Sequence, residues 1–187
     1  MRRAGPVPSI AGVDACVALL SYRGTARELV ARLKYRNARA SVDWLADGMS
    51  ELVRSWRCSP TPTPHTVVTW APANPAHART RGFDHGELLA RAVAQRLELP
   101  AQRLLRRDRG APLTGRSAAE RHGGPPLRAT RHPLAGARVL VVDDVITTGA
   151  TLASAARALR SMGATRVFAV AAAYTPLPSN GPTAAAV

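Results

Sequence analysis

Residues 139–173 follow a strand–helix–strand pattern, which limits the fold more than any other part of the sequence. Val139–Val142 is a continuous apolar run, typical of a parallel strand covered on both faces. The spacing predicts a helix over about 150–162, with Gly163 as its C-terminal cap, and a second strand over 166–173. Such a βαβ unit should have a right-handed crossover. We therefore predict an α/β fold with a mostly parallel, twisted sheet flanked by helices.

The rest of the chain adds a strand and further helices. Val67–Trp70 predicts a buried strand, and the next helix should begin with Asp84 as N-cap and Glu87 as its partner. Thr25–Glu28 is a capping-box pattern that should open an earlier helix, and another should run over 42–56.

A proline-rich breaker at 59–64 suggests how the chain is divided. We expect an N-terminal helical segment over 1–62, part of the core or packed on it, beginning with a loose arm at 1–12. The core should span 63–176, followed by a disordered tail at 177–187.

Residues 103–138 have an unusual composition, with nine arginines and only two acidic residues. We interpret them as mostly a long, flexible basic loop, with a short strand near Leu104–Leu105. The whole chain has a net charge of +14, which favours polyanionic partners such as nucleic acid or phosphorylated metabolites. Only Lys34 is a lysine, so GC-rich codon usage explains the arginine excess equally well.

Two adjacent acids, Asp143 and Asp144, follow the first strand of the βαβ unit. Ligands of open α/β sheets bind beyond the carboxyl ends of the strands, so this pair is well placed for a site. Neighbouring carboxylates repel each other unless something compensates. A vicinal diol can donate two hydrogen bonds to them, and a divalent metal, directly or through water, is a second compensator.

The turn after the acids opens a helix and is rich in hydroxyl groups and small residues: Thr147, Thr148, Gly149, Ala150 and Thr151. Unpaired backbone N–H groups and the helix dipole favour an anion here. A diol site followed by a phosphate cradle matches ribose 5-phosphate. In the simpler alternative, the aspartates only cap the helix and the threonines fill a turn. A Walker-type loop is excluded because no GxxxxGK[ST] run is present.

The stretch Val139–Thr151 resembles the phosphoribosyl pyrophosphate (PRPP) signature of type I phosphoribosyltransferases at all thirteen positions. Further stretches resemble the ComF-type competence branch: Leu33–Arg36, Trp70–Pro72 and Arg81–Asp84 with Leu88–Ala90. The likeness covers roughly 22–174. It implies the type I phosphoribosyltransferase fold and transfer of a 5-phosphoribosyl group from PRPP with release of pyrophosphate.

The resemblance assigns roles to the residues of the signature. Asp143 and Asp144 would hold the ribose hydroxyls, and would contact Mg²⁺ only indirectly, via water or PRPP. Mg²⁺ usually accompanies PRPP in that superfamily. The 5-phosphate would be held by the turn that follows, through Thr147, Thr148, Gly149, Ala150 and Thr151.

Two loops complete the site that the resemblance implies. The loop after the first core strand would contact pyrophosphate through Ala71, Pro72, Ala73 and Asn74. A flexible loop would close over the site, and it corresponds to about 106–121. Catalytic residues are not identified, but four arginines are candidates to stabilise the leaving pyrophosphate: Arg79, Arg81, Arg116 and Arg121.

The sequence also departs from the family pattern. Cys16 and Cys58 cannot form the four-cysteine zinc module with which ComF-type proteins often begin. His122 follows Arg121, so the Arg-x-x-Asn pattern of the basic loop is absent. Thr147 stands where the purine-salvage branch has a carboxylate, which argues against hypoxanthine-type activity. We expect no glutaminase domain, and therefore no glutamine-dependent amidotransfer.

Three functions stay open: a phosphoribosyltransferase with an unidentified acceptor, a ComF-type accessory of DNA uptake, and a PRPP-sensing regulator. The accessory would bind a nucleotide, single-stranded DNA or a partner helicase, but stacking aromatics are scarce at 4%. His77, His85 and His132 have no partner that the sequence identifies, so we interpret them as surface or packing residues. We expect a cytoplasmic protein without a membrane span, and a homodimer is one option.

Overall fold

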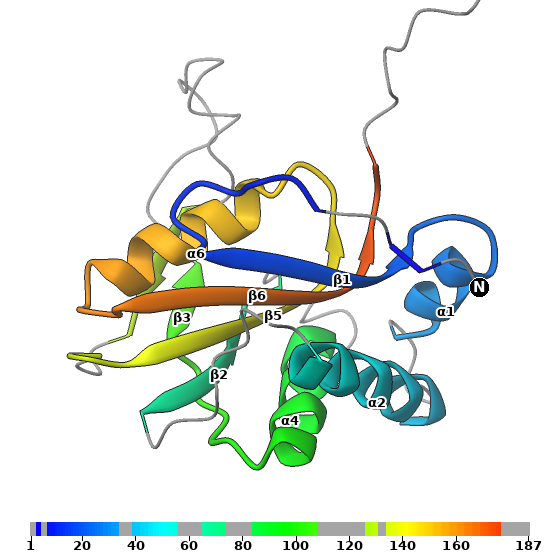
Figure 1. Ribbon diagram of the computed structural model, residues 1–187, viewed down its shortest axis with the longest axis horizontal. Helices are drawn as coiled ribbons and strands as arrows, with labels where there is room; N and C mark the ends of the chain where they lie inside the picture. The colour runs from blue at the N-terminus through cyan, green and yellow to red at the C-terminus, as the bar shows by residue number, and fades with distance from the viewer. Residues whose placement is uncertain are drawn as a thin grey trace, which may run out of the picture.

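A four-stranded, fully parallel sheet forms the centre of the molecule (Figure 1). The computed structural model describes residues 3–4, 7–33, 39–55, 65–73, 84–107, 126–130 and 134–176. The strand order is β1-β6-β5-β2, and each neighbouring pair is parallel. The strands are β1 Ala15–Ser21, β2 Thr66–Trp70, β5 Arg138–Ile146 and β6 Arg166–Tyr174. The predicted α/β class is therefore confirmed.

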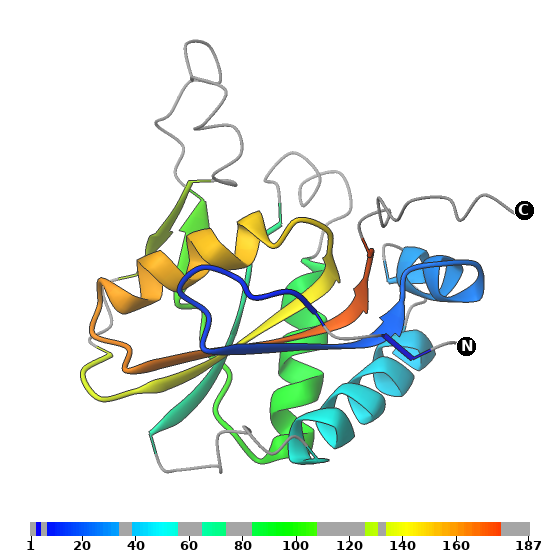
Figure 2. The same ribbon diagram turned by 45° about the horizontal axis from the view of Figure 1, so that its top comes forward.

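Helices cover both faces of this sheet (Figures 1 and 2). One face carries α2 and α4, with α1 beside α2, and the other carries α6. Their bounds are α1 Thr25–Arg32, α2 Arg39–Ser55, α4 His85–Leu97 and α6 Ala150–Arg160.

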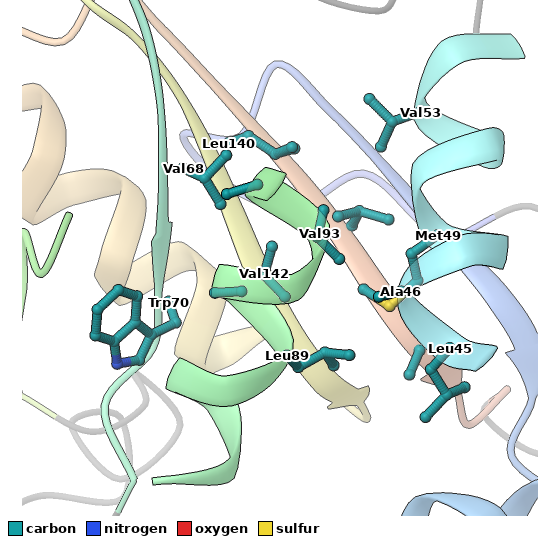
Figure 3. Packing of buried hydrophobic residues seen from close by; sticks show 14 of the residues in the cluster. Leu45, Ala46, Met49, Val53, Val68, Trp70, Leu89, Val93, Leu140 and Val142 are labelled. Carbon is teal, nitrogen blue, oxygen red and sulfur yellow. The ribbon is translucent and has the colours of Figure 1, made fainter. Parts of the chain in front are cut away.

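Alternation of side chains along β5 explains why both faces need a cover. Leu140 and Val142 pack against α2 and α4 (Figure 3), while Val139 and Val141 pack on the α6 side. All four are at most 1% exposed. Burying a side chain of this size contributes about 1.5–3 kcal/mol. The whole run gains this stability only when helices cover both faces of the sheet.

The N-terminal segment, which was expected to be helical, also contains a strand. Its strand β1 pairs with β6 along one edge of the sheet. The expected loose arm is also wrong where it is described: Ala4 N–H donates to Leu19 O, and Ile10 is 8% exposed against the α6 side of the core. β1 was not predicted because its run of apolar residues shows no clear alternation with polar ones.

A separate two-stranded sheet lies beside the main sheet, and short backbone contacts cover the main sheet's β2 edge. Leu105–Arg107 (β3) pairs with Leu127–Ala129 (β4) in an antiparallel pair on the α6 side. The predicted strand near Leu104–Leu105 is thus shifted slightly, and β4 was not predicted. At the β2 edge, Val68 N–H donates to Pro100 O and Gln102 N–H donates to Val68 O, so this edge strand is covered by chain.

Helix starts show mixed agreement with the sequence patterns. Asp84 is the N-cap of α4, as predicted, and its Oδ1 accepts from Gly86 N–H and Glu87 N–H. The capping box at Thr25 is wrong, because Gly24 is the N-cap and no side chain caps the helix.

The predicted linker at 59–64, most of the basic loop (108–125) and the tail at 177–187 lie outside the described residues. Among described helices, none combines the length and apolar character needed to cross a membrane.

Candidate functional site

The acid pair lies on a part of β5 that extends beyond its neighbour β2. The register pairs Trp70, the last residue of β2, with Val142, so Asp143 and Asp144 come next along β5 with no β2 residue beside them. The strand does not end at the acids, as the sequence suggested, because β6 continues alongside and pairs Asp143 with Ala171 and Val145 with Ala173. The pair therefore sits at a step in the carboxyl edge of the sheet.

The two carboxyl groups have opposite electrostatic environments. Burial, and then the charge of Asp144, raise the pKa of Asp143 well above its ordinary value. Burial also opposes ionisation of Asp144, but hydrogen bonds from His85 and from Val145 N–H outweigh it and lower the pKa of Asp144. Because the pKa values of the two carboxyl groups are shifted in opposite directions, the pair carries its negative charge mainly on Asp144.

His85 is a functional-site candidate that the sequence analysis misjudged. Its Nε2 lies 2.9 Å from Asp144 Oδ2, so it has a partner in the site and is not a surface histidine. The two residues are 59 positions apart in the chain, and no local pattern could have revealed the contact. His77 and His132 lie outside the described residues.

The loop after β2 is held against the start of α4. Asp84 Oδ2 accepts a hydrogen bond from Ala73 N–H at 3.2 Å, while its Oδ1 caps the helix. Ala71, Pro72 and Ala73 line the same pocket as the acid pair. Asn74 lies outside the described residues.

Arg107, at the end of β3, is a second residue that the sequence analysis did not single out. Its Nε donates to Pro72 O at 2.9 Å, which brings the guanidinium into the pocket. Burial lowers the pKa of Arg107, and the carboxylates of Asp84 and Asp143 oppose that effect. The site therefore contains a half-buried cation as well as the acids.

The predicted phosphate-binding turn leads into α6. Gly149 is its N-cap at a φ of 77°, no side chain caps the helix, and Thr148 Oγ1 accepts from Ala150 N–H at 3.4 Å. Thr147 and Thr148 are exposed. Of this turn, Thr151 shares the pocket lining with the acid pair.

These elements enclose one pocket of about 330 Å³, within the size range of small-molecule sites. The residues that line it come from the loop after β2, the start of α4, the end of β3, the β5 acids and α6: Ala71, Pro72, Ala73, Asp84, His85, Gly86, Arg107, Asp143, Asp144 and Thr151. The four candidate catalytic arginines, Arg79, Arg81, Arg116 and Arg121, lie outside the described residues.

A family comparison gives this arrangement its context. The model of the phosphoribosyl transferase domain matches residues 84–178, about half of the chain, and includes the acid pair and the turn after it. The chain belongs to the phosphoribosyltransferase domain family.

Two curated relatives with similar sequences are also named phosphoribosyltransferases. Adenine phosphoribosyltransferases of Mycobacterium avium and Mycolicibacterium paratuberculosis are each 40% identical over 112 residues, covering 55% of this chain and 61% of theirs. The chain thus matches less than two thirds of these curated relatives.

Structural comparison supports the fold. The PRPP amidotransferase of B. subtilis, solved with ADP and GMP, superposes with a TM-score of 0.50 at 22% identity, over 76% of this chain and 30% of that one. The type I phosphoribosyltransferase fold expected from the sequence is therefore confirmed, whereas the comparisons do not show the ComF-type branch.

Proposed function

We propose that this phosphoribosyltransferase-domain protein binds PRPP and transfers its 5-phosphoribosyl group to an acceptor base, with release of pyrophosphate. The observation that carries the proposal is that the acid pair, the start of α6, the loop after β2 and Arg107 line the same pocket. Each part offers a group that one portion of PRPP requires.

The ribose would lie against the acid pair. Its two neighbouring hydroxyls can donate hydrogen bonds to carboxylate oxygens, and such charge-assisted bonds are stronger than neutral ones. Asp144 suits this role because it holds its negative charge despite burial. Asp143 is costly to ionise without a ligand, so a diol or a cation nearby would stabilise its charged form.

The 5-phosphate would lie at the start of α6. With Gly149 as N-cap and no side-chain cap, the first-turn N–H groups remain suited to an anion, although Thr148 already bonds to one of them. Thr151 projects from the first turn into the pocket lining and is a hydroxyl donor for the phosphate.

Mg²⁺ fits this donor set as a shared ion. The described residues contain no cluster of three or more metal-ligating side chains, so a cage made only by protein is not formed there. Mg²⁺ usually keeps several waters and binds ligand phosphates, so Asp143 and Asp144 would act on the ion indirectly, through water or PRPP. When bound, the ion would neutralise charge on the pyrophosphate.

The pyrophosphate would occupy the side of the pocket formed by Ala71–Ala73 and Arg107. As the bond from C1 of the ribose to the pyrophosphate oxygen breaks, positive charge develops on the ribose and negative charge on the leaving group. A fixed guanidinium stabilises that negative charge, and Pro72 O fixes Arg107 in the pocket. Arg79, Arg81, Arg116 and Arg121 remain candidates for the same task.

Adenine is the first acceptor to test, because the curated relatives are named adenine phosphoribosyltransferases. Calorimetric titration with Mg–PRPP should show binding that both Asp144→Asn and Thr148→Val weaken. Glu51→Gln, which removes an exposed carboxylate of α2, and Thr25→Val, at the exposed start of α1, are the matched controls. Release of pyrophosphate is then measured with adenine and a panel of other bases. Equal affinity in the site variants and the controls would contradict the assignment.

Non-catalytic functions have their own outcomes in the same experiments. Binding of PRPP without turnover on any base would favour a PRPP-sensing regulator. The net charge of +14 favours a polyanion partner, as a ComF-type accessory of DNA uptake would need. Oligonucleotide binding that falls steeply with salt would support that role, and a flat response would oppose it.

A further inference from the structure

The contact between His85 and Asp144 joins two elements that otherwise contribute separately to the pocket. His85 is the first residue of α4, and Asp144 lies on the extended part of β5. Their side chains are only 13% and 22% exposed, so the 2.9 Å bond is largely shielded from water. A shielded bond to a carboxylate is worth more than one on the surface.

This bond completes the restraint on the Asp144 carboxylate. Val145 N–H donates to Oδ1 at 2.8 Å, and His85 Nε2 holds Oδ2 at 2.9 Å. With one donor on each oxygen, the plane of the carboxylate cannot turn without breaking a hydrogen bond. Its remaining lone pairs then keep a fixed direction toward the pocket that both residues line.

The other ring nitrogen indicates which way the hydrogen bond runs. His85 Nδ1 is buried and has no hydrogen-bond partner within the described residues. A proton on Nδ1 would therefore be a buried N–H without an acceptor, whereas a proton on Nε2 points directly at a carboxylate oxygen. The arrangement assigns the proton to Nε2, with His85 as donor and Asp144 as acceptor.

We propose that His85 is a positioning residue, which fixes the Asp144 carboxylate in the orientation that receives the ribose hydroxyls of PRPP. This role rests on the proposed function, since it acts through Asp144 on the same ligand. In this role His85 makes no hydrogen bond to the ligand, because its Nε2 is bonded to Asp144 and its Nδ1 is buried.

A pair of substitutions that differ by one methylene tests the role. In His85→Gln, the side-chain amide nitrogen takes the place of Nε2 and can still donate to Asp144. In His85→Asn, the amide is one bond shorter and falls near the position of Nδ1, so the donor is lost. Affinity for Mg–PRPP and for ribose 5-phosphate is measured by calorimetry, with Mg–pyrophosphate, which has no ribose, as the control ligand.

We expect His85→Asn to weaken both ribose ligands by about 10- to 100-fold, as for loss of a hydrogen bond to a charged group, and His85→Gln to stay within about threefold of wild type. Mg–pyrophosphate should bind equally to all three proteins. In an Asp144→Ala background, which leaves no side-chain acceptor for His85, His85→Asn should have no further effect, whereas a residue needed only for packing would add its own loss.

The outcomes separate this role from the proposed function. If wild type binds neither ribose ligand, the proposed function fails and the role with it. If wild type binds both and His85→Asn binds them equally well, the role alone is overturned. A long-range ¹H–¹⁵N spectrum of the wild-type ring tests the donor directly and needs no stable variant: a proton on Nδ1 and none on Nε2 would overturn the assignment.

Discussion

Gly149 allows a quantitative test of how the N-terminal segment supports the turn before α6. Its φ of 77° is costly for any residue with a Cβ, by about 1–2 kcal/mol. A Cβ built there would also meet Ile10 Cγ1 at 2.9 Å and Cδ1 at 3.0 Å, and overpacking of this kind costs about 1–3 kcal/mol. Gly149→Ala should therefore lower the free energy of unfolding by about 2–5 kcal/mol.

A matched glycine separates these two contributions. Gly136 has nearly the same φ, 76°, but a Cβ there would have no atom within 4 Å, so Gly136→Ala reports the backbone cost alone. Both substitutions are made in wild type and in an Ile10→Ala background, and unfolding is followed in urea. Removing Ile10 should reduce the cost of Gly149→Ala to about 1–2 kcal/mol and leave that of Gly136→Ala unchanged. An equal loss for Gly149→Ala in both backgrounds would refute the contact.

Three further results are expected. Because the pKa of Asp143 is raised, the folded state binds its proton more tightly, so this group's contribution to stability is lost as pH rises from the ordinary Asp value through the raised one. Without ligand, the free energy of unfolding of Asp143→Asn, measured in urea, should therefore rise relative to that of wild type by up to about 1.4 kcal/mol per pH unit in that window. A difference that stays constant with pH would contradict this. Asp84→Ala should cost about 0.5–2 kcal/mol in thermal unfolding relative to Asp84→Asn, which keeps a capping oxygen; equal stability would argue against the cap. Burial, and then the charge of Asp143, raise the pKa of Cys16 to about 12, although the residue is only partly buried. In a Cys58→Ser variant at pH 8, a thiol reagent should therefore label Cys16 much more slowly in the folded protein than in denaturant, and equal rates would contradict the raised pKa.

The elements that the sequence predicted correctly are those whose signal is local. Val139–Val142 and 166–173 are long apolar runs around an amphipathic helix, and in the structure they become the two central strands. Asp84 was recognisable as a cap because its partners are two and three residues away. The acid pair was found because in the sequence it directly follows an apolar run and precedes a threonine-rich turn that opens a helix.

The features that were missed depend on residues far apart in the chain. β5 continues past its acids because β6 pairs with them, and carboxylates alone do not favour a strand. β1 joins the sheet by pairing with β6, which lies about 150 residues later. The bonds from His85 to Asp144 and from Arg107 to Pro72 likewise join distant segments, so the sequence offered no spacing from which to infer them.

The position of β1 and β2 has a practical consequence for anyone who shortens this protein. A fragment cut to residues 84–178 would keep both acids and the turn before α6, yet it would lack the outermost strand on either side. The two central strands would then expose apolar edges with unpaired backbone N–H and C=O groups to solvent, and such edges favour self-association. Such a fragment should precipitate, so binding studies call for the whole chain.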